Sequence, residues 1–327
     1  MNHFSVNRFL LPLARTFTSS LLPSVKALVE DKAYNEIPDL LAKTYHSTRT
    51  ANPFSFLSTI SESNRTRIVD DVLQAWISVR PQSRVRTAYS FLLNHILQSE
   101  SSLSLALAVL QHFLRSGSLP HPQCYLTLSS RWLDRVRELG SPSKVFVEMK
   151  IIGYLPDCRL CNYVISSLCE VDRIREALEI LKGMREAGCP PDVESYGILI
   201  AAICDAGRTS AAIDLLNEMV LKEGLMPRQD TIWKVTATLR LSRELRKAAK
   251  VIDLLEKQGC AIQFNVYEAL VKSCVNLEDF VMAARVLVRM VNKGFIPFIN
   301  TRQTVIDGLV AAGKSNLAGV VWQRLAD

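Results

Sequence analysis

The residue types that most often perform catalysis are present in this chain, but they are not spaced for it. There is no glycine-rich phosphate loop, no HxE motif followed by a CxxC pair, and no acidic cluster suited to a catalytic metal. The histidines have no neighbours arranged as a nucleophile–base triad. We therefore predict a non-enzymatic protein without a metal or cofactor. The five histidines are His3, His46, His95, His112 and His121.

Eight cysteines are scattered along the 327 residues, unlike the dense framework of a small secreted protein. Cys158 and Cys161 form a lone CxxC pair. A zinc site would need a second ligand pair at suitable spacing, and no HxxxH accompanies this one. We interpret the cysteines as small buried apolar residues on helices. They are Cys124, Cys158, Cys161, Cys169, Cys189, Cys204, Cys260 and Cys274.

Basic side chains gather over residues 240–250, where they could hold nucleic-acid phosphates by charge alone. A run of arginines at 131–137 offers the same chemistry. Such runs are also typical of a solvated helix face, and this alternative stays open. The formal net charge is +7, and residues 1–29 supply +3 of it, so the remaining chain permits a nucleic-acid partner without demanding one. The phosphate-binding candidates are Arg243, Arg246, Lys247 and Lys250.

The N-terminal segment has the composition of a targeting signal. Residues 1–29 contain no acid, and Arg8 and Arg15 interrupt any apolar core that a secretory signal would need. We predict an organellar transit peptide over residues 1–20, for the mitochondrion or, as the alternative, the chloroplast. No apolar run approaches the ~18 residues of a membrane-spanning helix, so we expect no membrane partner.

The elements that must position these residues follow an internal repeat. Glycines recur at steps of 35 or 36 residues, and a proline stands three positions after each of them except one, where the residue is Ile262. Periods of this size are typical of stacked supersecondary units. The glycines are Gly117, Gly153, Gly188, Gly224, Gly259 and Gly294.

One unit, residues 193–228, can be interpreted residue by residue. Apolar residues recur at helical spacing over 193–203, and Gly207 is placed to end that helix. A second apolar face follows over 211–219, and Gly224 and Pro227 end it. Met219 precedes Gly224 by five residues instead of four, which indicates a one-residue insertion near Glu223. Each unit is thus predicted to be a helical hairpin whose open apolar face the next unit covers.

These segments resemble pentatricopeptide repeats, as in LCNYVISSLCEVDRIREALEILKGMREAGCPPD over residues 160–192. The resemblance covers about three quarters of the chain and implies an all-α fold, a right-handed α-solenoid of 35-residue helix-turn-helix repeats. Residues 21–86 match the repeat poorly and are predicted to be a degenerate helical N-terminal cap. The predicted repeats are 87–121, 122–157, 158–192, 193–228, 229–263, 264–298 and a truncated 299–327.

The resemblance also implies a way of binding RNA. In this family one repeat meets one base, and the fifth and last residues of the repeat contact the base edge. In 158–192 these residues are Asn162 and Asp192, the pair that the family uses for uracil. An amide can pair with a Watson–Crick edge and a carboxylate can orient it. Asn and Asp are also common in turns and at helix starts, so a purely structural role for the two residues stays open.

The other repeats depart from the family's base-reading combinations. The corresponding pairs include Gly197 with Arg228 and Trp233 with Gln263. Trp233 could stack on a base, although a tryptophan in a helical repeat is more often part of the core. The second positions of these two repeats hold Glu194 and Asp230, acids that would repel phosphate.

Two functions therefore remain in view. The first is a non-enzymatic, organellar RNA-binding protein in post-transcriptional RNA metabolism (processing, stability or translation), with single-stranded or structured RNA as its partner. The alternative is a protein-binding scaffold or a ribosome-associated helical-repeat subunit, whose partners are the ribosome or other proteins. The family resemblance and the Asn162–Asp192 pair favour the first, and the departures in the other repeats favour the second.

Overall fold

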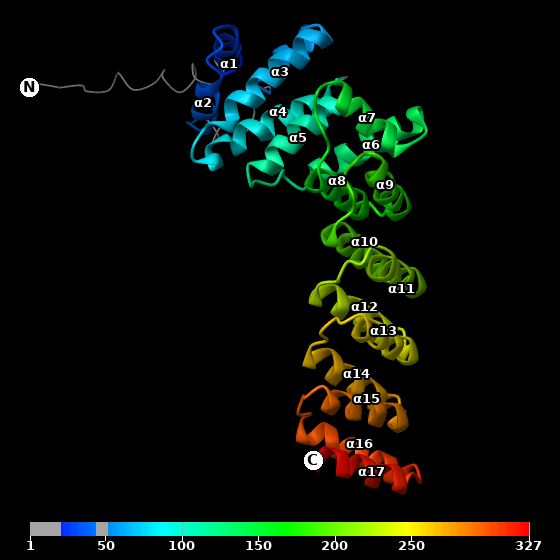
Figure 1. The fold of residues 1–327 in the computed structure, drawn as a ribbon. Coiled ribbons are helices and arrows are strands. Elements are labelled where there is room, and N and C mark those ends of the chain that lie inside the picture. Colours follow the sequence, from blue (N-terminus) through cyan, green and yellow to red (C-terminus); the bar gives the residue numbers. More distant parts are fainter. Residues whose placement is uncertain (1–20, 44–51, 100, 327) are drawn as a thin grey trace, which may run out of the picture. The chain divides into compact units, whose positions relative to one another are not determined.

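The structure is a computed structural model that describes residues 21–43, 52–99 and 101–326. These residues form α-helices joined by short turns, and no strand occurs among them (Figure 1). Within the same ranges, no helix is both long and apolar enough to cross a membrane. The predicted all-α fold is confirmed. The chain divides into two compact units, one up to Pro190 and one from Pro191 onward, which we describe separately.

In the first unit, the helices between residues 21 and 77 pack around a buried tryptophan. Trp76 has no exposed surface, and its ring meets the edges of Phe54 and Tyr89 at centroid distances of 6.3 and 5.0 Å. The indole nitrogen donates a hydrogen bond to the carbonyl of Tyr34 at 2.9 Å, so its one polar group is satisfied. The main helices here are α1 (Leu21–Glu30), α2 (Ile37–Lys43) and α3 (Glu62–Ile77).

Three helix pairs complete the first unit. The first helices of the pairs pack on one another in sequence, and so do the second helices. This is the arrangement expected when each hairpin covers the apolar face of the one before it. The pairs are α4 (Arg86–Gln98) with α5 (Leu103–Arg115), α6 (Cys124–Leu139) with α7 (Pro142–Ile151), and α8 (Cys158–Glu170) with α9 (Ile174–Glu186).

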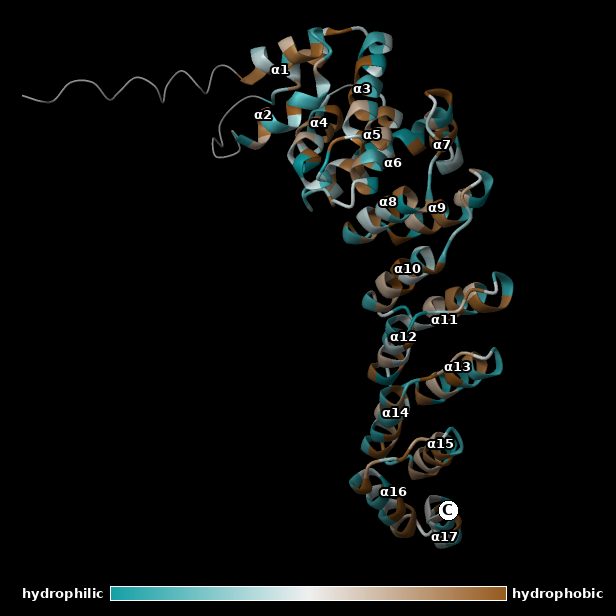
Figure 2. Ribbon diagram, turned by 60° about the vertical axis from the view of Figure 1, so that its left-hand side comes forward, coloured by the Kyte–Doolittle hydropathy of each residue, from teal (hydrophilic) through white to brown (hydrophobic). Residues whose placement is uncertain are grey.

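The second unit consists of four further pairs, in which α10, α12, α14 and α16 form one layer and α11, α13, α15 and α17 the other (Figure 2). We call these the first-helix layer and the second-helix layer. The pairs are α10 (Val193–Asp205) with α11 (Thr209–Asn217), α12 (Gln229–Leu241) with α13 (Leu245–Lys257), α14 (Phe264–Asn276) with α15 (Phe280–Asn292), and α16 (Ile299–Ala311) with α17 (Ser315–Ala326).

Small residues and glycines set the shape of each pair. Ala212, Ala248 and Ala283 are at most 1% exposed, so their small side chains let neighbouring helices approach closely. Gly188 and Gly259 follow α9 and α13 with φ of +79° and +81°, a left-handed conformation that glycine adopts without a steric penalty. The two glycines therefore end their hairpins in the same way, one in each unit.

The inserted residue near Glu223 is absorbed by a change of helix type. After α11 the chain continues as a π-helical turn over Glu218–Lys222. A π turn accommodates one more residue than the α-helix it interrupts. Gly224 then takes the same left-handed conformation as the other repeat glycines, with φ of +65°, so the register of the next repeat is kept.

Candidate nucleic-acid interface

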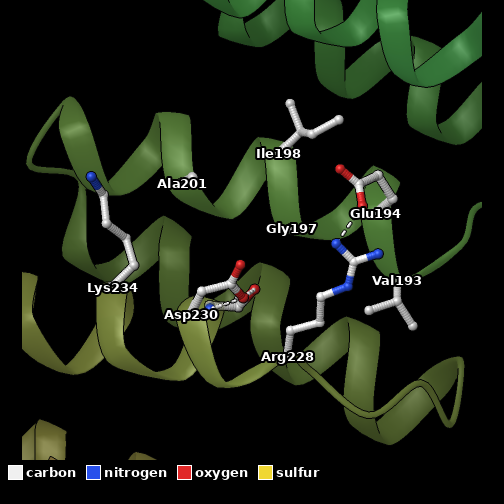
Figure 3. A pocket seen from close by; sticks show the side chains of 9 residues that line it. Val193, Glu194, Gly197, Ile198, Ala201, Arg228, Asp230 and Lys234 are labelled. Carbon is white, nitrogen blue, oxygen red and sulfur yellow. Dashed lines mark hydrogen bonds and ion pairs between the residues drawn. The ribbon is translucent and has the colours of Figure 1, made fainter. Parts of the chain in front are cut away.

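A pocket opens between the first helices of two neighbouring repeats in the second unit. It lies between α10 and α12 and has a volume of about 270 Å³ (Figure 3). Val193, Ile198 and Ala201 contribute apolar side chains from α10. The remaining lining residues are Glu194, Gly197, Arg228, Asp230, Thr231 and Lys234.

The pocket exists because the fifth position of this repeat is a glycine. A Cβ atom on Gly197 would lie 3.5 Å from Oγ1 of Thr231, the third residue of the next repeat. Any larger side chain at position 197 would therefore extend into the space between the two helices. The two base-reading candidates of this repeat, Gly197 and Arg228, are thus brought to the same pocket.

Two ion pairs border the pocket. The guanidinium of Arg228 lies 2.5 Å from the Glu194 carboxylate, and the Lys234 ammonium lies 2.5 Å from the Asp205 carboxylate. The side chains of Arg228 and Glu194 are 57% and 45% exposed, and an exposed pair of this kind contributes only about 0–1 kcal/mol. An anionic ligand can therefore displace either carboxylate from its basic partner with only a small loss of free energy.

An aromatic side chain lies on the same layer. Trp233 is 39% exposed, so it is a surface residue of α12 and not part of the core. The Arg240 guanidinium carbon lies 5.1 Å from the centroid of its ring, within the range of a cation–π contact. Gln263, the other candidate of this repeat, is exposed at the residue before α14. An exposed indole and an exposed amide are suited to stacking on a base and to bonding with its edge.

Comparison with known proteins decides the family. A model of the PPR repeat family matches residues 156–205, and one described as pentatricopeptide repeat-containing protein matches residues 193–290. A curated pentatricopeptide repeat-containing protein of Arabidopsis thaliana is 43% identical over 319 residues, which cover 97% of this chain and 93% of that protein. The chain belongs to the pentatricopeptide repeat family.

Solved structures of pentatricopeptide repeat proteins are also similar. The crystal structure of PPR10 from maize matches with a TM-score of 0.42 and 16% identity, over 94% of this chain and 55% of that one. PPR10 in complex with an 18-nt psaJ RNA element matches with a TM-score of 0.36 and 17% identity, over 93% and 53% of the two chains. This chain thus spans about half the length of the solved structures that it matches.

The two base-reading candidates of the pentatricopeptide repeat 158–192 fall in different units. Asn162 belongs to the first unit and is 8% exposed on α8. Asp192 belongs to the second unit and caps α10, where its carboxylate accepts a hydrogen bond from the Ser195 backbone at 2.8 Å and the Ser195 hydroxyl bonds back to the Asp192 backbone. The sequence leaves open that Asp192 serves to start a helix, and this capping box shows it in that role. Reading of a base by the pair stays a prediction.

The basic cluster lies on the other layer of the pentatricopeptide repeats. Arg246, Lys247 and Lys250 are exposed on α13, and Arg243 precedes this helix in a turn with φ of +59°. Lys247 and Lys250 line a second groove, of about 350 Å³, between α11 and α13. Three of the four phosphate candidates are therefore on the second-helix layer, and the pocket at Gly197 is on the first-helix layer. Lys247 also pairs with Glu244 at 2.8 Å.

The arginines at 131–137 make contacts within the chain. The Arg131 guanidinium donates to the carbonyls of Leu97 and Ser99 at the end of α4. Arg135 is bonded to Glu148, which holds its pKa above the usual range, and Arg137 pairs with Asp134 at 3.0 Å. All three arginines of this run therefore have hydrogen-bond or ion-pair partners within the chain.

Two polar residues of the pocket were not singled out from the sequence, namely Lys234 and Thr231. Lys234 stands one residue after Trp233, and Thr231 is the third residue of its repeat. A search confined to the fifth and last positions of each repeat misses both. Thr301 holds the same third position as Thr231 two repeats later, so an alignment of the repeats would have drawn attention to it.

Proposed function

We propose that this protein binds RNA without catalysing a reaction and acts in the processing, stability or translation of an organellar transcript. The observation that supports this best is the pocket between α10 and α12, where Gly197 leaves space and Arg228 stands at the edge. A base placed there would meet the apolar side chains of α10, and Arg228 would exchange Glu194 for a base edge or a phosphate. Exposed Trp233, the residue before the pocket-lining Lys234, offers a stacking surface.

The proposed compartment is the mitochondrion, with the chloroplast as the alternative. This rests on the composition of residues 1–20, which lie outside the described residues. A fluorescent fusion tests it: the full chain should enter the organelle, and the chain lacking residues 2–20 should remain in the cytosol. Unchanged import of the shortened chain would contradict the proposal.

The RNA proposal is tested by fluorescence anisotropy with short uridine-containing single strands. Asn162→Ala should weaken binding to a preferred strand by about tenfold, because one good side-chain contact to a base is worth ~1–3 kcal/mol. The preference should relax at one base only. The control variant with Arg246→Ala and Lys247→Ala should weaken all strands alike and flatten the salt dependence. Equal affinity of the wild type and Asn162→Ala for every RNA would remove the base-reading proposal.

The second candidate function is a protein-binding scaffold or a subunit associated with the organellar ribosome. It is favoured by the acids on the first-helix layer, since Glu194 neutralises Arg228 and Asp205 neutralises Lys234. Crosslinking the protein in organelles and sequencing the attached RNA separates the two functions. The first predicts messenger or precursor transcripts, and the second predicts ribosomal RNA and sedimentation with ribosomes.

A further inference from the structure

Three cysteines gather at one end of the α8–α9 hairpin, inside the first unit. Cys158 is the first residue of α8, and its sulfur lies 3.2 Å from the sulfur of Cys189, which stands 31 positions later. Cys161 is fully buried on the same helix, and hydrogen bonding to Cys189, together with burial, raises the pKa of its thiol. The CxxC pair of the sequence thus meets a third cysteine that its spacing did not reveal.

Repeat geometry explains why these two positions meet. The Cys158 thiol lies 3.3 Å from the carbonyl of Pro190, directly after Cys189. Two repeats later, Gln229 is again the first residue of a first helix, and its amide donates to the carbonyl of Ala261 at 2.6 Å. Ala261 directly follows Cys260, which occupies the place of Cys189. The first residue of a repeat thus contacts the segment that ends the same repeat, and in 158–192 both positions are cysteine.

We propose that Cys158 and Cys189 form a redox-active dithiol site, which a small-molecule disulfide such as glutathione disulfide converts into an intrachain disulfide. Cys158 is partly exposed and Cys189 is 4% exposed, so Cys158 is the thiol that meets the oxidant. Its thiolate attacks one sulfur of glutathione disulfide, which forms a mixed disulfide and releases the first glutathione. Cys189, after losing its proton, attacks the Cys158 sulfur and releases the second glutathione. Two protein thiols are oxidised and one glutathione disulfide is reduced to two glutathiones.

The geometry requires only a small local movement. The two sulfurs must approach from 3.2 Å to about 2.05 Å. The new bond closes a covalent loop around the whole α8–α9 hairpin, the repeat that carries Asn162. Because such a loop restricts the unfolded chain, oxidation should raise the Tm of the first unit by roughly 5–10 °C. The redox state would thereby set the stability of this one repeat, whether or not the protein binds RNA.

The test is thiol mapping on the full, reduced chain. The protein is exposed to glutathione disulfide, free thiols are blocked, and the peptides are identified by mass spectrometry. We expect a crosslinked peptide joining Cys158 and Cys189 that a reductant removes, while Cys260 forms no intrachain bridge. Cys158→Ser and Cys189→Ser should each abolish the crosslink and the rise in Tm. Gln229→Cys should gain a second crosslink, between positions 229 and 260, because it recreates the pair in a neighbouring repeat.

Three outcomes would overturn the proposal. One is a bridge between Cys161 and Cys189 in place of the Cys158 bridge. Another is separate glutathione adducts on Cys158 and Cys189 with no intrachain bond. The third is full blocking of both thiols after exposure to glutathione disulfide. Wild-type protein alone reveals each of these, so the test does not depend on whether a variant folds.

Discussion

The repeats 193–228 and 264–298 both consist of two packed helices, but they contact the repeat that follows them in different ways. In the first, the fifth residue is Gly197, and the space in front of Thr231 is open. In the second, the fifth residue is Glu268, and its carboxylate accepts a hydrogen bond from the Thr301 hydroxyl at 2.5 Å. Glu268 is 4% exposed, so its side chain occupies the place that is empty at Gly197. One residue therefore decides whether a junction is open or filled.

The same two repeats also differ at the turn between their helices. The turn residue is Gly207 in one and Glu278 in the other, with φ of +66° and +59°. The backbone is therefore the same, although only glycine takes this conformation without a steric penalty. The comparison teaches that buried apolar residues determine the helix pairs, while the fifth position and the turn residue differ between these two repeats. Differences in function are expected at the fifth position, where Gly197 leaves space and Glu268 fills it.

The largest expected effect tests the packing between layers. Gly308 on α16 faces the ring of Phe280 on α15, and a Cβ atom at position 308 would lie well inside contact distance of that ring. Gly308→Ala should therefore cost about 2–3 kcal/mol of unfolding free energy, as overpacking does. The matched control is Gly197→Ala on α10, where the added carbon has an ordinary contact and should cost nothing. Equal denaturant midpoints for the two variants would contradict this account of the junctions.

A smaller effect is expected at the ion pairs between repeats. Burial would raise the pKa of Glu256, but hydrogen bonds from Arg289 and Tyr267 outweigh it and hold the pKa below its usual range. A carboxyl with a lowered pKa adds stability above about pH 4, and this stability is lost as the pH falls through the lower, folded-state pKa. Glu256→Gln should cost about 1.5–2 kcal/mol at pH 7 and flatten the loss of stability below pH 4.

The control for this prediction is Glu194→Gln, which removes an exposed carboxylate from the same unit. Its exposed pair with Arg228 should contribute under about 1 kcal/mol. Chemical denaturation across the acid range measures both variants. An unchanged acid profile in Glu256→Gln would show that other carboxyl groups govern the acid response.

The smallest expected effect lies at the turns. Gly207→Ala should destabilise the protein by about 1 kcal/mol, because it places a Cβ atom in a left-handed conformation. Glu278→Gly should stabilise the protein by a few tenths of a kcal/mol, because it removes the same penalty. Paired thermal melts measure the difference. If both substitutions shift the Tm in the same direction, backbone strain does not distinguish these turns.

The helix pairs could be predicted from the sequence because glycines and apolar residues recur with a 35–36-residue period. The extra residue near Glu223 was also visible, although its form as a π turn was not. Contacts between repeats could not be predicted, since the facing of Gly197 and Thr231 depends on how two helices pack. The approach of Cys189 to Cys158 and the capping of α4 by Arg131 were hidden for the same reason. The placement of the basic cluster on the second-helix layer likewise required the packed structure.

The pocket at Gly197 is the central element of the proposed RNA surface, and filling it is the most direct test. Gly197→Glu places a glutamate at the fifth position of this repeat. Glu268 already occupies the fifth position of repeat 264–298 and fills the junction there. The control is Ser315→Glu on α17, which adds the same charge at an exposed position of the second-helix layer, away from the basic cluster.

The measurement is the anisotropy of a labelled uridine-containing single strand titrated with each variant at one salt concentration. We expect Gly197→Glu to weaken binding by about tenfold, equivalent to about 1.4 kcal/mol, and Ser315→Glu to weaken it by less than about threefold. Equal weakening by the two variants would show that only charge matters. Unchanged binding by Gly197→Glu would contradict the role of the first-helix pocket in holding RNA.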